Sequence, residues 1–333
     1  MISRRFTRKA VAAAAVSAGA IAAAATVALA MPAGASTTSA ASHGYTFKTV
    51  INHRDVTFNQ LLGINQAGLI AGYFGSGATG HPNKGYTVKA PYHQGNFKNE
   101  NFPHSAQTQV TGLNDIGYTV GFWVNKAGAN FGFYKHNGQF HKVDFPGVPN
   151  SSPQMDQLLG VNDNRIAVGF YANAASPAAN DRGFEYNIKT HKFSRIIQPG
   201  VGHLNLKTPS LTAAAINNHN TVAGFYTTKS GVTDGFIKRA SGQFVKLAYP
   251  GASMTQAFGI NDSGLVVGAY TTGSGSSAQT WGFTWKSGHF HKVNDPHGIG
   301  STIINGVNDR GDLVGFYMDA ANNNNTDGFV AKP

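Results

Sequence analysis

The stretch Gly259-Ile260-Asn261-Asp262-Ser263-Gly264-Leu265-Val266-Val267-Gly268 decides how this chain folds, because related phrases occur six times along it. Each copy opens with a small residue, an aliphatic residue and Asn. The six openings are Gly63-Ile64-Asn65, Gly112-Leu113-Asn114, Gly160-Val161-Asn162, Ala215-Ile216-Asn217, Gly259-Ile260-Asn261 and Gly306-Val307-Asn308. Successive Asn residues are 49, 48, 55, 44 and 47 positions apart. Repeats of this length are typical of propeller blades and are long for most solenoids.

Four strands are predicted within one repeat, with the fifth copy as the example. Residues 261–264 predict a tight turn, because Asn and Asp cap turns with their side chains and Gly tolerates a positive φ. Pro296 ends the last strand, since proline cannot donate to a strand ladder. The predicted strands cover residues 256–260, 265–270, 281–285 and 289–293.

The two ends of the chain complete one repeat between them. The sixth copy stops after its third strand, at Gly328-Phe329-Val330, while residues 45–50 resemble the fourth strand at residues 138–143. A fourth strand supplied by the N-terminus would close the ring and remove an exposed sheet edge. The predicted fold is therefore all-β, a six-bladed β-propeller with four strands per blade, whose last blade is closed by an N-terminal strand.

The first 35 residues predict a secretory signal peptide. Four basic residues between positions 4 and 9 precede an uncharged, Ala-rich segment at residues 10–30, and Ala33-Gly34-Ala35 offers a small-residue cleavage site. This three-part pattern directs export. The segment is also long enough for a retained anchor, and the pair Arg4-Arg5 leaves the twin-arginine route open. We expect cleavage, a secreted protein, and a single domain over residues 36–333.

The composition of the mature chain is mildly basic and free of cysteine. Loss of the signal takes away four basic residues and no acidic one, so the formal net charge falls from +11 to +7. Such a charge favours acidic polymers as partners, but no nucleic-acid-binding motif is present. The 41 Gly residues of the full chain suit short strands joined by many turns. We expect a monomer with no nucleic-acid partner, and no membrane span after cleavage, because no second long apolar run follows.

The phrases at residues 259–268 and the Asp-Gly-Phe triplets at 234–236 and 327–329 resemble the bacterial extracellular repeat proteins of the HAF-repeat family. The likeness extends over essentially all of the mature chain. It implies export and a β-repeat fold but no reaction. The family's His-Ala-Phe triplet reads Gly-Phe or Gly-Tyr here, so no role of a repeated His carries over.

Three sets of polar residues could bind a metal ion or an anion. Each set can also be explained by a role in turns, packing or protection of a strand edge. Asn-Asp pairs in four copies suggest calcium, but each turn offers one carboxylate on a separate blade, and tight turns select these residues. His289 and His291 share one face of a strand, yet zinc needs three or four converging ligands. Basic residues on the fourth strands would bind a polyanion or protect a sheet edge. They are Lys142, Arg195, Lys246 and Lys292. We predict no metal and no cofactor.

No hydrolase signature, phosphate loop or dinucleotide fingerprint occurs in the chain. The aspartates of the loose loops are the reservoir for carboxylate chemistry, namely Asp156, Asp181, Asp234 and Asp319. An enzyme usually breaks the symmetry of a repeat fold with unlike titratable groups at one mouth, so these similar repeats favour a non-catalytic binding or scaffold protein. The alternative is a secreted propeller hydrolase or lyase that acts on polysaccharide at the channel mouth.

The predicted working surface follows from loop lengths. Turns between strands one and two, and between strands three and four, are short. The other two connections are long and variable, and they leave a four-stranded meander on the same side. They include residues 75–84, 146–156, 172–182, 199–210 and 318–327. Variable loops over a rigid scaffold are where binding groups concentrate.

Two kinds of side chain are predicted to surround the channel on this long-loop face. The innermost strand opens with an amide in four copies, namely Gln60, Gln109, Gln157 and Gln256. The second strand ends there with an aromatic ring, including Trp123, Tyr171, Tyr226, Tyr270 and Tyr317. Amides bond the hydroxyl groups of a glycan, and aromatic rings stack on its faces. We therefore predict these nine residues as ligand-binding, with envelope or extracellular polysaccharide as the partner. In the alternative, the rings pack between blades and the amides pair within the protein.

Overall fold

The computed structural model describes residues 44–146, 155–172, 181–198, 210–228 and 231–333. The predicted signal peptide therefore lies outside the described residues, as do parts of three predicted long loops. Within the described part the helical segments are two short 3₁₀ turns, η1 (Gln94–Asn96) and η2 (Gly275–Ser277). Neither has the length and apolar character needed to cross a bilayer.

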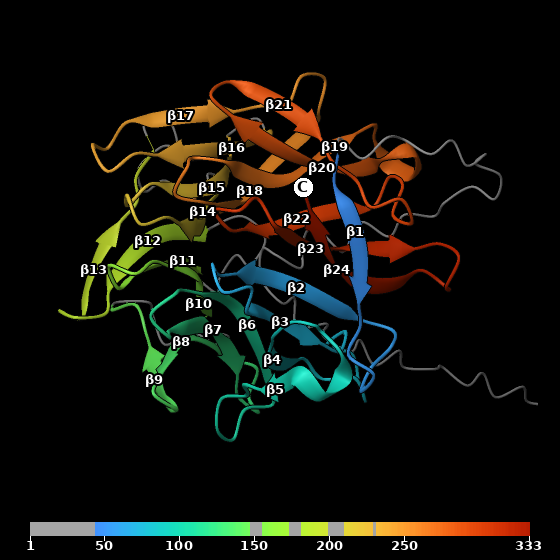
Figure 1. The fold of residues 1–333 in the computed structure, drawn as a ribbon. Coiled ribbons are helices and arrows are strands. Elements are labelled where there is room, and N and C mark those ends of the chain that lie inside the picture. Colours follow the sequence, from blue (N-terminus) through green and yellow to red (C-terminus); the bar gives the residue numbers. More distant parts are fainter. Residues whose placement is uncertain (1–43, 147–154, 173–180, 199–209, 229–230) are drawn as a thin grey trace, which may run out of the picture.

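In the described part of the chain, twenty-four strands form six four-stranded antiparallel units that follow one another around a central axis (Figure 1). The first three units contain β2 (Asn59–Ile64), β3 (Ile70–Phe74), β4 (Lys84–Val88) and β5 (Phe97–Asn99); β6 (Gln107–Leu113), β7 (Thr119–Val124), β8 (Asn130–His136) and β9 (Gln139–Val143); and β10 (Met155–Val161), β11 (Ile166–Ala172), β12 (Asp181–Asn187) and β13 (Lys192–Arg195). The next two contain β14 (Ser210–Ile216), β15 (Val222–Thr227), β16 (Thr233–Lys238) and β17 (Phe244–Leu247); and β18 (Met254–Ile260), β19 (Val266–Thr272), β20 (Gln279–Lys286) and β21 (His289–Lys292). The sixth contains β22 (Thr302–Val307), β23 (Leu313–Asp319), β24 (Asn325–Lys332) and, from the other end of the chain, β1 (Thr46–Val50).

The first strand of each unit is the innermost one. Each first strand lies against the first strands of both neighbouring units, including β22 against β2. Adjacent units are also joined by single parallel bridges, such as Asn130 with Met155 and Thr233 with Met254. Antiparallel meanders set around an axis in this way define a β-propeller architecture. The all-β expectation is confirmed.

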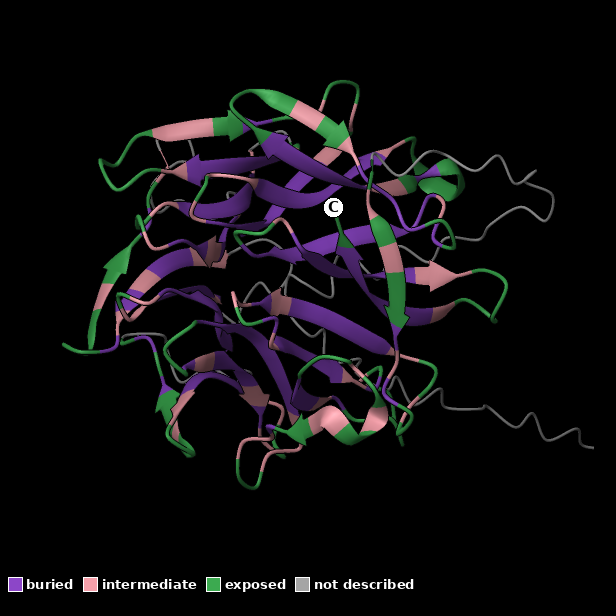
Figure 2. Cartoon of the chain, viewed as in Figure 1, coloured by how far each residue is buried: buried purple, intermediate pink, exposed green. Residues whose placement is uncertain are grey.

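The apolar core lies between neighbouring units. Its largest fully buried side chains include the aromatic residue that follows Gly in each third strand, namely Tyr86, Phe133, Phe184, Phe236, Phe283 and Phe329. Figure 2 shows the inner strands buried, whereas the outer strands β9, β13 and β21 are partly exposed. Burial on both faces explains the near-continuous apolar runs of the inner strands, because neither face meets water.

The N-terminal strand pairs where the repeat pattern predicts it. Thr46–Val50 runs antiparallel to β24, with Thr46 opposite Lys332 and Val50 opposite Gly328. Val50 is 2% exposed, and the ring of Phe47 packs 5.2 Å from that of Phe329. The prediction that residues 45–50 supply the fourth strand of the last repeat is confirmed.

The repeated Asn links each unit to the next through its side chain. Asn114 shows the pattern: its Oδ1 accepts the N–H of Tyr118 at 2.9 Å, and its Nδ2 donates to the carbonyl of Asn162 at 2.9 Å. Equivalent bonds between units run through all six copies and return from Asn308 to Asn65 at 3.3 Å. Both the oxygen and the nitrogen of each Asn side-chain amide thus form hydrogen bonds, which explains why Asn occurs in every copy.

Strand boundaries in the fifth unit differ from the predicted ones by at most two residues. The loop predicted at residues 271–280 is shorter, because Thr271 and Thr272 continue the ladder opposite Thr280 and Gln279. Polar Thr and Gln carry no apolar signal at these positions, so the pattern ended the strands too early. Hydrogen bonding between facing backbones extends them.

Candidate functional site

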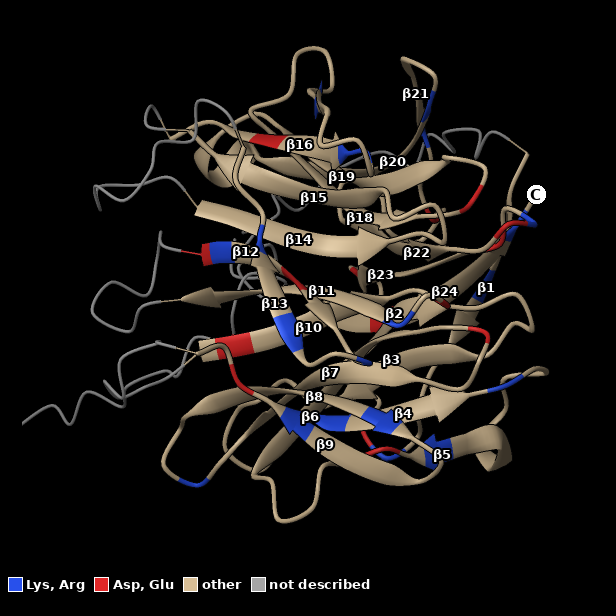
Figure 3. Ribbon diagram, turned by 90° about the vertical axis from the view of Figure 1, so that its left-hand side faces the viewer, with Lys and Arg blue, Asp and Glu red and all other residues tan. Residues whose placement is uncertain are grey.

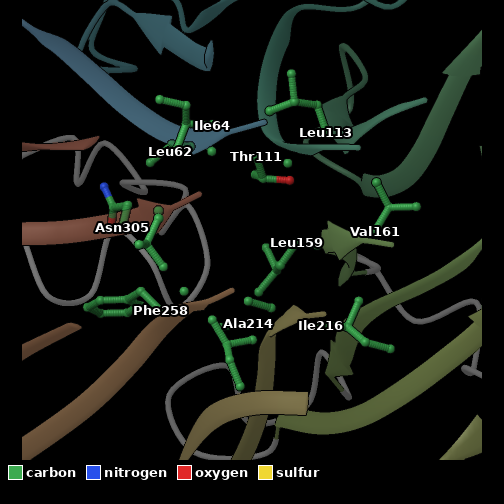
Figure 4. A pocket seen from close by; sticks show the side chains of 18 residues that line it. Leu62, Ile64, Thr111, Leu113, Leu159, Val161, Ala214, Ile216, Phe258 and Asn305 are labelled. Atoms are coloured by element: carbon green, nitrogen blue, oxygen red, sulfur yellow. The ribbon is translucent and has the colours of Figure 1, made fainter. Parts of the chain in front are cut away.

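Three consecutive residues of every first strand line a pocket on the axis (Figure 4). The cavity measures about 90 Å³, and the side chains that line it are apolar except for Thr111 and Asn305. Its polar side chains are already bonded within the protein. Thr111 Oγ1 donates to the carbonyl of Leu158 at 2.8 Å, and Asn305 Nδ2 donates to that of Leu61 at 3.0 Å.

The repeated Gly of the first strands keeps this axis narrow. A Cβ on Gly112 would lie 2.7 Å from the carbonyl oxygen of Leu159 and 3.1 Å from the Cα of Gly160. The residue before each Gly forms a bulge, since the ladder skips Leu62, Thr111 and their counterparts. A bulge re-aims its side chain, which brings Thr111 to the carbonyl of the next unit.

The four predicted Gln residues lie on the first strands, on the long-loop side of this pocket. They are the second or third residues of their strands and are buried, with exposures of 1% (Gln60), 3% (Gln109), 0% (Gln157) and 7% (Gln256). Gln60 Oε1 accepts the hydroxyl of Tyr73 at 2.9 Å, and Gln109 Nε2 donates to Asn83 Oδ1 at 2.9 Å. These two amides thus pair partly within the protein.

Part of this amide set has no hydrogen-bond partner among the described residues. Gln60 Nε2, Gln157 Nε2 and Gln157 Oε1 are buried and unbonded there. A buried polar atom without a partner costs about 1–3 kcal/mol. Gln157 is therefore the residue of this set with most unused hydrogen-bonding capacity. A role of the four Gln residues in ligand binding remains a prediction.

The predicted aromatic residues contribute to packing between units. Trp123 stacks on Phe102 with ring centroids 4.4 Å apart, and Tyr270 stacks on Tyr249 at 3.5 Å. Tyr171 stacks likewise on Phe145 at 4.0 Å. In each pair, the partner comes from the connection that follows the preceding unit's fourth strand. One face of these rings is therefore already covered.

Tyr226 and Tyr317 are buried as well, with 6% and 2% exposure. Trp123 and Tyr171 are half-buried and are the predicted aromatic residues with ring surface left for a ligand. The packing interpretation therefore describes the observed contacts of all five rings. Their role as a sugar-stacking surface remains a prediction.

Four aspartates converge around the axis on the opposite, short-turn face. They are Asp115, Asp163, Asp262 and Asp309, and each Oδ1 accepts a backbone N–H from the preceding unit at 2.7–3.0 Å. Burial, followed by the charges of the other three, raises the pKa of Asp115. Each carboxylate comes from a separate unit, as predicted, although their charges act on Asp115 because the units meet at the axis. Their role in the turns is supported by the bonds, and no group of metal-ligating side chains occurs among the described residues.

The loop aspartates predicted as a catalytic reservoir have structural partners. Asp156 accepts the N–H of Phe145 at 2.9 Å, Asp181 accepts the hydroxyl of Thr212 at 2.9 Å, Asp234 pairs with Lys246 at 2.8 Å, and Asp319 accepts the N–H of Ala321 at 2.9 Å. Burial raises the pKa of Asp181 to about 6. These carboxylates therefore tie loops and strands together.

The basic residues of the fourth strands lie on the outside of the units (Figure 3). Lys142 lies 3.8 Å from the ring centroid of Phe131 and pairs with Asp144. Lys292 lies 3.2 Å from the ring centroid of Trp281. Such contacts hold the cations over the edge of their own unit, as expected for protected outer strands.

Comparison with known proteins concerns the fold. No family model matches this chain, and no curated protein matches it. Luciferin-regenerating enzyme is similar in structure, with a TM-score of 0.50 and 8% identity over 87% of this chain and 96% of that one. TolB from Acinetobacter baumannii has a TM-score of 0.48 and 11% identity over 79% of this chain, which spans 63% of the TolB chain. The fucose-specific lectin from Aleuria aurantia has a TM-score of 0.48 and 12% identity over 82% of this chain and 91% of that one.

These identities are low, so the likenesses describe the architecture alone. The six antiparallel units around a common axis place this chain in the class of all-β, propeller-like repeat proteins. The resemblance to HAF-repeat proteins rests on the repeat phrases.

Proposed function

We propose that this chain is an exported, non-catalytic binding protein built as one closed six-bladed propeller over residues 36–333. Its ligand is an extracellular or envelope glycan, bound on the long-loop face. The unbonded amides of Gln60 and Gln157 carry this proposal, because they offer donors and an acceptor beside the axis.

The six-bladed, closed architecture has three supports. Six four-stranded units follow one another along the chain. The Asn side chains bond from unit to unit and return from the sixth to the first. The N-terminal strand occupies the fourth position of the last unit, as a closing strand would. Pairing of β1 covers the edge of β24, which would otherwise promote aggregation.

A glycan suits the chemistry of the Gln residues. An amide offers two N–H donors and a carbonyl acceptor, and sugar hydroxyl groups complement both. The half-buried rings of Trp123 and Tyr171 border the same face and would stack against a sugar. Because the Gln side chains are buried, we infer that the glycan displaces part of the covering connections when it binds.

The alternative function is cleavage of polysaccharide by a hydrolase or lyase. It needs a carboxyl group that is free to donate or accept a proton at the substrate. Asp181 and Asp234 are engaged with Thr212 and Lys246, which favours binding without turnover. Loss of polysaccharide-degrading activity in Asp156→Asn or Asp181→Asn would reverse this preference.

Replacement of Gln109, Gln157 and Gln256 together by Ala tests the site. We expect at least about a tenfold loss of affinity for purified cell-wall polysaccharide, because each lost hydrogen bond contributes roughly 1 kcal/mol. The measurement is titration calorimetry or a pull-down, with circular dichroism to establish that the fold is kept.

Replacement of the exposed Gln139 and Gln243 by Ala serves as the matched control. We expect these changes to leave binding unaltered. Undiminished binding by the triple variant would place the site elsewhere. Binding lost only on changes at the Asn-Asp turns would place it on the short-turn face.

A further inference from the structure

One buried aspartate lies in the sixth unit and a second lies in the connection that leads into it. Asp295, in the connection between β21 and β22, is 0% exposed, and Asp327, on β24, is 2% exposed. Within the described part of the chain, Asp295 Oδ2 and Asp327 Oδ1 have no hydrogen-bond partner. Burial of an unpaired charge is costly, so such a group tends to take up a proton.

This pair lies beside the strand that closes the ring. Asp327 is directly opposite Tyr317 in the β23–β24 ladder. The hydroxyl of Tyr317 lies 3.0 Å from Thr49 Oγ1 on β1. Tyr317 therefore lies between Asp327 and β1, so that a change in the charge of Asp327 affects a residue that contacts β1 directly.

The charged groups around the pair are mostly negative. Asp319 lies on the same face of β23 as Tyr317. Its negative charge raises the pKa of both Asp295 and Asp327. Among the described residues, the basic side chain paired with Asp295 is His297, whose Nδ1 lies 3.0 Å from Asp295 Oδ1 and whose side chain is 66% exposed. On the other side of β24, the first unit contributes the uncharged Asn59 and Leu61.

The lysines of the two closing strands are engaged elsewhere. Lys48 Nζ on β1 donates to the carbonyl of Pro91 at 3.0 Å. The positive charge of Lys332, at the end of β24, lowers the pKa of Asp312. From the fifth unit, Thr280 of β20 bridges to Ser301 without a charge. Thus none of these neighbouring strands brings a cation to Asp327.

The direction of proton linkage follows from these surroundings. Burial, with the charges of Asp319 and Asp295, raises the pKa of Asp327 from its ordinary 3.8 to about 6. Burial likewise raises the pKa of Asp295, although His297 opposes the shift. The folded state therefore holds a proton that the unfolded state has lost between about pH 4 and 6. Stability falls as the pH rises through this interval and stays low above it.

We propose that Asp295 and Asp327 form a proton-controlled latch on the strand that closes the ring. With the pair protonated, β1 stays firmly on β24. With the pair ionised, repulsion among Asp295, Asp319 and Asp327 loosens β1. The ring is thus closed most firmly in mildly acidic surroundings.

The test compares the wild-type mature chain with Asp327→Asn, which keeps the shape of the side chain and removes its charge. Two readouts are the thermal midpoint from pH 4.5 to 8 and the hydrogen-exchange protection factors of β1 amides. In the wild type, we expect both to fall as the pH rises. In the variant, we expect β1 protection to be higher than in the wild type at pH 7.5, by about tenfold or more, and nearly independent of pH.

Asp181→Asn is the matched control, because burial also raises the pKa of Asp181, which is half-buried and lies in the third unit. It should alter the pH dependence of the global midpoint and leave that of β1 protection unchanged. Asp295→Asn provides a second variant if Asp327→Asn folds poorly. Protection of β1 that varies with pH as much in both latch variants as in the wild type would overturn the proposal, as would wild-type protection that does not vary.

Discussion

A chain that begins at Ile51 should lose at least about 4 kcal/mol of stability and aggregate, compared with one that begins at Gly44. The deletion removes the whole of β1, including the buried Val50 and the contact between Phe47 and Phe329. Each buried apolar side chain contributes about 1.5–3 kcal/mol. The loss also leaves β24 as an unpaired edge, which invites edge-to-edge association.

Thermal unfolding and light scattering measure both effects, and we expect the midpoint to fall by roughly 10 °C. The chain that begins at Gly44 is the matched control, since it keeps β1 and lacks the residues before it. A synthetic peptide of residues 44–52 added in trans should restore part of the stability. Equal midpoints and equal solubility of the two chains would contradict the closing role of β1.

Gly121→Ala should destabilise the protein by about 3 kcal/mol or more. Gly121 lies on β7 opposite Val110, and an added Cβ would lie 2.0 Å from the carbonyl oxygen of Gln109 and 3.0 Å from the ring of Phe133. The backbones of β6 and β7 would have to separate. Overpacking a well-filled interior usually costs 1–3 kcal/mol, and here the obstacle is backbone, which yields least.

Urea unfolding measures this cost. Gly95→Ala is the control, because a Cβ there would lie 3.7 Å from its nearest neighbour and the residue has no positive φ. We expect Gly95→Ala to change stability by less than about 0.5 kcal/mol. A Gly121→Ala variant as stable as the control would show that the two strands can part without cost.

The sequence predicted much of the fold because the same local residue pattern occurs in six copies. Gly at the close approach of strands, an aromatic residue behind it and Asn at the turn each meet a local requirement, so their recurrence gives the period and the strands. The incomplete sixth copy and residues 45–50 together indicated closure, since an unpaired edge strand is unfavourable. Ladder ends were less predictable, because Thr271 and Thr272 pair through their backbones.

The candidate site was less predictable than the fold. Gln157 and Tyr270 were recognised as recurring positions, but sequence could not tell whether each side chain faces a ligand, a neighbouring unit or the core. The stacking of Tyr249 on Tyr270 joins residues of adjacent copies. A recurring Phe-Pro or Tyr-Pro pair after the fourth strand, as at Phe102 and Tyr249, was the signal that could have revealed this packing.

By itself, then, the sequence determined the all-β repeat, the number of its copies and the pairing of the two chain ends, because each rests on local rules repeated along the chain. Only the tertiary structure decided what meets at the axis and behind the closing strand. Asp115 and Asp262 are far apart in sequence, yet the charge of Asp262 helps to raise the pKa of Asp115 at the axis. Asp295 and Asp327 carry no shared motif, and the charge of Asp295 acts on Asp327 only because folding buries both beside the closing strand.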